Sequence, residues 1–155
     1  MSSTKVSTEE RQKMVAEAAY FRAKGRSFDG GDAISDWVEA ESEIDERLRQ
    51  MEHNALLERL QATFVSAREN LKSLRRKVAR RKVEARAEWQ KDLEKLAELQ
   101  DAFEHRLEEF RARGQLASRK LRQQAEEAAD EISRTISELS GRLSSRRRGT
   151  TRKGD

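Results

Sequence analysis

The sequence predicts an all-α protein, and three observations lead to that prediction. Ala, Glu, Lys, Leu and Arg make up more than half of the 155 residues, a composition typical of long helices and coiled coils. Proline is absent, so no residue forces a helix to kink. Apolar residues recur at steps of three and four over most of the chain, which is the helical period.

Composition also excludes several classes of protein. The 33 basic residues nearly balance the 29 acidic ones, so charge repulsion does not predict a disordered chain. Cysteine is absent, which excludes disulfides, thiolate metal sites and cysteine nucleophiles and fits the cytoplasm. No apolar run is long enough for a membrane span, and the polar start lacks the apolar core of a secretory signal. We therefore expect a cytoplasmic protein that does not bind membranes.

The first expected helix covers residues 8–24, after a disordered segment 1–7. Ser7 and Glu10 have the spacing of a capping box, in which each side chain accepts a hydrogen bond from the other residue's amide. Apolar residues then repeat at helical spacing from Met14 to Phe21. Gly25 follows at the position where a left-handed residue ends a helix.

A second helix is expected after the turn at residues 26–31, with Asp32 as its cap. Its apolar side begins with Ile34 and Trp37. We expect residues 8–46 to form a small hairpin of two antiparallel helices with Trp37 as its main buried anchor. The expected core of this module is Tyr20, Phe21, Gly25, Phe28, Trp37 and Ile44.

The same segment resembles a bacterial module. The residues that carry the resemblance are Ala18-Ala19-Tyr20, Gly25-Arg26, Gly30, Asp36-Trp37, Ala40-Glu41 and Ile44. Their spacing is similar to that of the domain of unknown function family twenty-nine thirty-four. The resemblance covers about residues 9–46 and implies a short helical hairpin and a bacterial source. It implies no activity.

Residues 47–143 are expected to form a long helical hairpin. A heptad seam begins with Leu57, Leu60, Phe64, Ala67, Leu71, Leu74 and Val78. The stripe resumes at Trp89 and continues to Phe110, and a third stripe runs from Leu121 to Leu143. Gly114 is the only glycine between the N-terminal turn and Gly141, so we expect the chain to fold back there and to pair Phe103 with Ala125.

The first part of this seam has no obvious partner within the chain if residues 33–112 form one continuous helix. A second chain would then cover it, and we expect a homodimer or another protein partner. The residues of this candidate seam are Leu57, Leu60, Phe64, Leu71, Leu74 and Val78. The main structural alternative is a three-helix bundle in which the long helix breaks inside the interval 75–86.

Two basic segments suggest a nucleic-acid contact. The interval 75–86 has seven basic residues and one acid, and the segment 144–155 is expected to be a disordered basic tail. The candidate contacts are Arg75, Arg76, Lys77, Arg80, Arg81, Lys82, Arg86, Arg146, Arg147 and Arg148. The alternative is a solvated helix whose cations face an acidic partner, such as the run from Asp36 to Glu46 in a second copy.

No enzyme, metal site, cofactor or small-molecule ligand is expected. His53 and His105 are far apart in the chain, and neither lies in the Glu-x-x-His pattern of a di-iron bundle. The sequence also lacks a Ser/His/Asp set and a phosphate-binding glycine loop. The expected function is that of a non-enzymatic coiled-coil scaffold or adaptor. The alternative is sequence-independent nucleic-acid binding.

Overall fold

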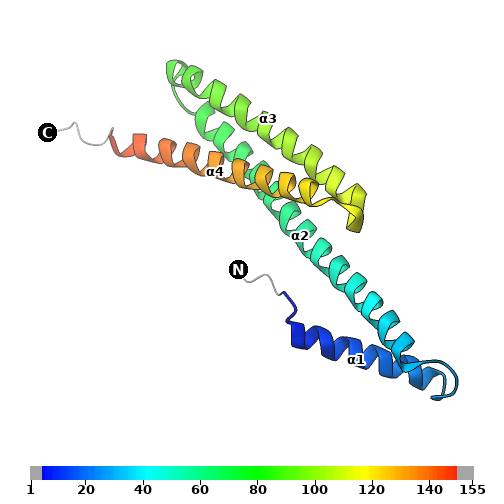
Figure 1. Cartoon of the computed structure of the whole chain (residues 1–155). Coiled ribbons are helices and arrows are strands. Elements are labelled where there is room, and N and C mark those ends of the chain that lie inside the picture. The colour runs from blue at the N-terminus through cyan, green and yellow to red at the C-terminus, as the bar shows by residue number, and fades with distance from the viewer. Residues whose placement is uncertain (1–4, 150–155) are drawn as a thin grey trace. The chain divides into compact units, whose positions relative to one another are not determined.

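The computed structural model describes residues 5–149, with side chains up to Ser145. Every regular element in this part of the chain is helical, which confirms the all-α prediction (Figure 1). The elements are α1 (Thr8–Gly25), α2 (Ala33–Ala79), α3 (Val83–Arg113), a short 3₁₀ turn η1 (Gly114–Leu116) and α4 (Arg119–Gly149). One compact unit ends at Asn54 and a second begins at Ala55, within α2.

Helix α1 begins as the sequence predicts. Ser7 Oγ accepts a hydrogen bond from the Glu10 amide at 3.2 Å, and Glu10 Oε2 accepts one from the Ser7 amide at 3.0 Å. This capping box pairs two amides that the first helical turn would otherwise leave without partners.

The end of α1 differs from the prediction at Gly25. Gly25 is still helical, and the left-handed residues are Ser27, with φ of 56°, and Phe28, with φ of 57°. The Phe28 amide donates to Ala23 O and the Ser27 amide to Lys24 O, both at 2.9 Å, which is the bonding pattern of a Schellman motif. The turn therefore has left-handed backbone at two residues with side chains, as well as at Gly30 and Gly31.

The hairpin core also differs from the prediction. Val15, Ala40 and Ile44 are buried, whereas Trp37 is 40% exposed. The expected core residues Tyr20, Phe21 and Phe28 are exposed as well. The register of α2 explains the difference, because Asp36, Ala40 and Ile44 at four-residue steps form its buried face. Trp37 lies about 100° further around the helix than Asp36 and so points away from that face.

The long helix is interrupted by three residues, Arg80, Arg81 and Lys82. The Arg81 amide donates to Val78 O at 2.9 Å, which closes a final tight turn of α2, and Lys82 then adopts an extended conformation. The expectation of one continuous helix over 33–112 is therefore wrong. The alternative, a break inside the interval 75–86, is what the structure has.

The break folds the second unit into a three-helix bundle made of α2 from Ala55 onward, α3 and α4 (Figure 1). One apolar cluster joins all three helices, and it includes Leu60, Trp89 and Ile132. The candidate seam lies in this cluster: Leu60, Leu71, Leu74 and Val78 are buried, and Leu57 and Phe64 pack against them half-buried. The seam is thus covered from within the chain, which corrects the expectation that a second chain is needed to cover it.

The return between α3 and α4 follows the prediction. Gly114 has φ of 55° and ends α3, and Ser118 Oγ accepts a hydrogen bond from the Leu121 amide at 3.1 Å near the start of α4. Phe103 and Ala125 are both fully buried, as expected for a large residue that packs against a small one. Helix α4 continues to Gly149, so the segment 144–149 is helical rather than disordered, and residues 150–155 lie outside the described part.

We predict that Leu74→Ala lowers the free energy of unfolding by about 2–5 kcal/mol, because it leaves a cavity in the bundle core. Urea titration followed by circular dichroism measures the change. Val65→Ala is the matched control, since Val65 lies on the same helix and is exposed. An unchanged urea midpoint for Leu74→Ala, together with a change in oligomeric state, would contradict burial within the chain.

Candidate nucleic-acid interface

The basic interval lies where α2 turns into α3. Arg75, Arg76 and Lys77 occupy the end of α2, Arg80–Lys82 form the turn, and Arg86 lies in the first turns of α3. All of them are exposed except Arg81, which is half-buried. We call these seven residues the basic end of the bundle.

The cations of the basic end have no acidic partner among the described residues. Arg81 Nη2 donates to the Leu143 carbonyl at 3.2 Å, and Arg86 Nε donates to the Arg81 carbonyl at 2.7 Å. Arginines elsewhere in the chain do form ion pairs, for example Arg59 with Glu126 at 3.3 Å. The basic end is therefore a concentration of positive charge that the described chain does not neutralise.

The last turns of α4 lie at the same end of the bundle. The bond from Arg81 to the Leu143 carbonyl joins the α2–α3 turn to α4. Arg142 lies over the ring of Trp89, 4.7 Å from its centre, and pairs with Asp92 at 3.1 Å. The backbone of α4 continues beyond Leu143 through the candidate residues Arg146, Arg147 and Arg148. The side chains of these three residues lie outside the described part.

Trp89 is a core residue and not a stacking surface. Its side chain is 2% exposed and belongs to the same cluster as Leu139. The remaining aromatic residues of the bundle, Phe64, Phe103 and Phe110, belong to that cluster too. The basic end thus offers charge and hydrogen-bond donors but no ring on which a base could stack.

The acidic run that could have neutralised the basic end is engaged within the N-terminal hairpin. Each arginine of α1 and its following turn binds acids of α2. The pairs are Arg11 with Glu41 and Asp45, Arg22 with Glu39 and Glu43, and Arg26 with Asp36. This arrangement disfavours the alternative in which two copies join the acidic run of one to the basic interval of the other.

A second basic cluster was not among the sequence-based candidates. Five basic residues and no acid lie in the segment 111–122 around Gly114, namely Arg111, Arg113, Arg119, Lys120 and Arg122. The cluster lies at the far end of α3, whose 31 residues span about 45 Å. A count of charge in a short sliding window would have found it. It holds fewer cations than the basic end.

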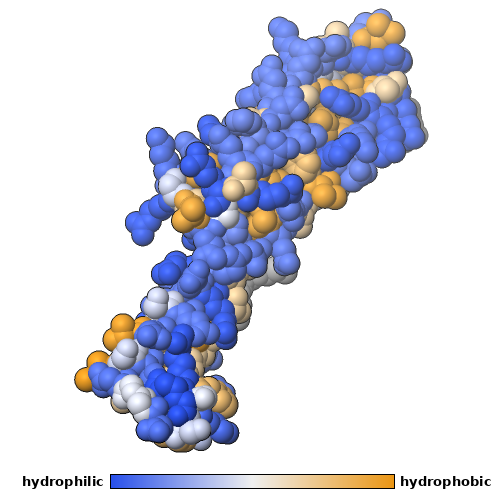
Figure 2. Space-filling model, turned by 90° about the vertical axis from the view of Figure 1, so that its right-hand side faces the viewer, coloured by the Kyte–Doolittle hydropathy of each residue, from blue (hydrophilic) through white to orange (hydrophobic). Residues whose placement is uncertain are grey.

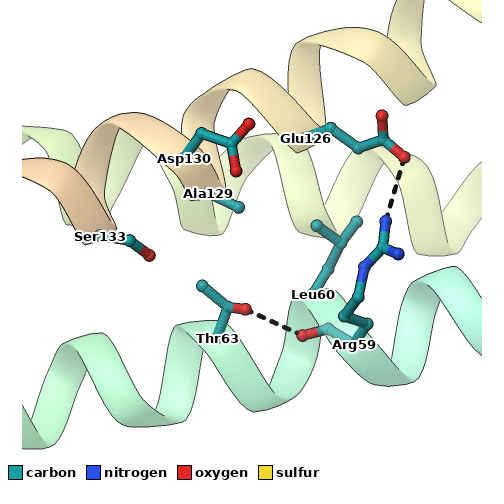
Figure 3. Close-up of a pocket in the computed structure, with 7 residues that line it drawn as sticks. All are labelled: Arg59, Leu60, Thr63, Glu126, Ala129, Asp130 and Ser133. Carbon is teal, nitrogen blue, oxygen red and sulfur yellow. Dashed lines mark hydrogen bonds and ion pairs between the residues drawn. The ribbon is translucent and has the colours of Figure 1, made fainter. Parts of the chain in front are cut away.

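The grooves and histidines of the described chain offer little chemistry. A groove of about 220 Å³ between α2 and α4 contains Glu126, whose carboxylate is paired with Arg59, and Thr63, whose hydroxyl donates to the Arg59 carbonyl at 3.0 Å (Figure 3). His105 is exposed beside Glu109, and His53 is buried in α2. Within residues 5–149, no three His, Asp or Glu side chains converge as metal ligands would.

Comparison with known proteins identifies only the N-terminal segment. Residues 10–46 match the family described as Protein of unknown function (DUF2934), which confirms the resemblance drawn from the sequence. No curated protein and no solved structure matches the chain. None of the described helices has a stretch long and apolar enough to cross a lipid bilayer.

The ion pairs of the hairpin predict how its stability depends on pH. Arg26 Nη1 donates to Asp36 Oδ1, and Arg26 Nη2 donates to Oδ2 at 2.6 Å. These bonds hold the pKa of Asp36 below its ordinary value, and the bonds from Arg11 do the same for the pKa of Asp45. Both carboxylates are charged in the folded state at a pH where they would already bind protons in the unfolded chain.

We predict that the stabilisation from the Arg26–Asp36 pair is complete above about pH 5 and is lost as the pH falls below about 4. Asp36→Asn should therefore be less stable than the parent chain at pH 7, and the difference should shrink toward pH 2. Urea titrations at a series of pH values measure it. Asp29→Asn is the control, because Asp29 lies in the same α1–α2 turn as Arg26 but forms no ion pair among the described residues. A difference that does not change between pH 7 and pH 2 would contradict this prediction.

Proposed function

We propose that this chain is a non-enzymatic helical adaptor that binds the phosphate backbone of nucleic acid through the basic end of its bundle. The observation that carries the proposal is that the seven cations of the basic end are clustered around one turn without acidic partners in the described chain. The phosphates of nucleic acid hold condensed counterions, and lysine and arginine side chains that neutralise those phosphates release the counterions, which favours binding.

The chemistry of the basic end supports binding that does not depend on base sequence. Arginine and lysine contacts to phosphates fix the position of a protein on a duplex but do not read bases. All aromatic residues of the bundle lie in its core cluster, so no stacking surface for unpaired bases is available there. Double-stranded nucleic acid, which has the higher density of phosphate charge, is therefore the favoured ligand.

The non-enzymatic part of the proposal is supported by the groove between α2 and α4, where Glu126 is paired with Arg59 and the Thr63 hydroxyl donates to the Arg59 carbonyl. The coiled-coil scaffold, in contrast, loses its physical basis, because the seam Leu57–Val78 packs against α3 and α4. Binding through the basic end does not require a second copy of the chain. A cytoplasmic setting is proposed as well, and the absence of cysteine fits it.

The test neutralises four exposed cations of the basic end: Arg75→Gln, Arg76→Gln, Arg80→Gln and Lys82→Gln. Fluorescence anisotropy with a labelled 30-base-pair duplex of arbitrary sequence measures the affinity from about 50 to 200 mM salt. We expect the slope of log affinity against log salt to become shallower by about four, and the affinity at 100 mM salt to fall by about tenfold or more.

The control makes the same charge change at the other end of α3: Arg111→Gln, Arg113→Gln, Arg119→Gln and Lys120→Gln. All eight positions are exposed, so both variants should fold. The control should lose much less affinity. Equal losses of affinity in the two variants would mean that the duplex responds to the net charge of the protein and not to the basic end. A parent chain that shows no salt-dependent binding of the duplex would refute the proposal.

A further inference from the structure

The N-terminal hairpin exposes every aromatic residue that it contains. Tyr20, Phe21 and Phe28 are 52%, 56% and 65% exposed, and Trp37 is 40% exposed. The bundle instead places all of its aromatic residues in its core cluster. Figure 2 shows hydrophobic side chains that interrupt the hydrophilic surface of the hairpin, at the bottom of the view. A group of exposed aromatic residues on a small module marks an interaction surface.

Three of these rings form a connected row beside a groove whose lining is half apolar and half charged. The ring centres of Tyr20 and Phe21 are 5.6 Å apart, and those of Tyr20 and Phe28 are 5.9 Å apart. Phe21 also lines a groove of about 520 Å³ between α1 and α2, where Met14, Ala18 and Ile44 provide the other apolar side chains. The charged side chains of its lining are Glu17, Arg22, Glu43 and Arg47. We call this groove and the three rings the aromatic face.

The geometry points to a helix as the occupant. A hairpin of two helices buries only Val15, Ala40 and Ile44 in its core, so its interhelical groove is left without a third layer. An amphipathic helix that lies in such a groove inserts apolar side chains at steps of three and four residues. It would complete a small three-helix unit.

The charge of the hairpin indicates what kind of helix fits. Residues 8–46 contain eleven acids and five basic residues. Arg11, Arg22 and Arg26 are already bound to acids of α2. The outer surface keeps Lys13 and Lys24, with Arg49 just beyond this segment, and Arg47 is paired with Glu43. A larger set of acids forms no ion pair among the described residues: Glu9, Glu17, Asp29, Asp32 and Glu46.

We propose that the aromatic face binds a cationic amphipathic helix of another protein. The same face of a second copy would bring two acidic surfaces together, and an anionic lipid surface would be repelled in the same way. A helix with leucine-like anchors and lysine or arginine on its flanks satisfies both the groove and the charge. The aromatic face and the basic end would give the adaptor two surfaces of opposite charge, but the binding of this helix does not depend on nucleic acid.

The experiment uses the full chain and a labelled 18-residue helical peptide of Leu and Lys with amphipathic spacing. Phe21→Ser with Phe28→Ser should weaken peptide binding by about tenfold or more, measured by anisotropy at about 150 mM salt. The matched control is Val83→Ser with Leu116→Ser, two exposed apolar residues of the bundle, and it should leave binding unchanged. A peptide with Glu in place of every Lys should bind at least about tenfold more weakly than the Lys peptide.

Three results would overturn the proposal. Equal binding of the Lys and Glu peptides would refute the charge argument, and equal losses in the two Ser variants would remove the aromatic face as the site. A dimer in sedimentation equilibrium that Phe21→Ser with Phe28→Ser abolishes would assign the face to a second copy. None of these results bears on duplex binding by the basic end, so the two proposals succeed or fail separately.

Discussion

The fold of the bundle depends on the break between Ala79 and Val83. A continuous helix would keep a few more backbone hydrogen bonds, each worth about 1 kcal/mol net, but would leave the seam from Leu57 to Val78 in water. Burial of a large apolar side chain is worth about 1.5–3 kcal/mol, and four of the seam residues are buried in the bundle. Burial of the seam therefore outweighs the lost hydrogen bonds, and it favours the break although the turn contains neither proline nor glycine.

The same break creates the candidate binding surface. On one continuous helix the cations of the interval 75–86 would be spread along and around a rod, whereas the turn gathers them at one end of the bundle. The bond from Arg81 to the Leu143 carbonyl brings the end of α4 to this place. The hairpin has the opposite charge pattern. Its arginines form ion pairs with acids of α2, and the remaining surface is acidic and aromatic.

Sequence reasoning predicted the features that depend on local chemistry. The capping box at Ser7 and the return at Gly114 are examples, because each follows from a few neighbouring residues and their backbone preferences. The features that it missed or left as alternatives depend on competition between distant parts of the chain. The sequence around Arg81 carries no stop signal, so only the packing of α3 and α4 decides between a rod and a bundle. The prediction that Trp37 is buried was wrong because a two-helix hairpin buries only a narrow face of each helix. Trp37 is one residue from the buried Asp36, which turns its side chain by about 100° away from that face.

Intramolecular cross-linking tests most directly whether the chain covers its own seam. Thr63 on α2 and Ser133 on α4 line the same groove, and the absence of native cysteine makes a double variant, Thr63→Cys with Ser133→Cys, free of competing thiols (Figure 3). A short bis-maleimide, added to dilute protein, should join the two cysteines within one chain and leave the mass of a single chain plus one linker. Cross-links found only between chains would contradict the bundle and restore the long helix whose seam a second chain covers.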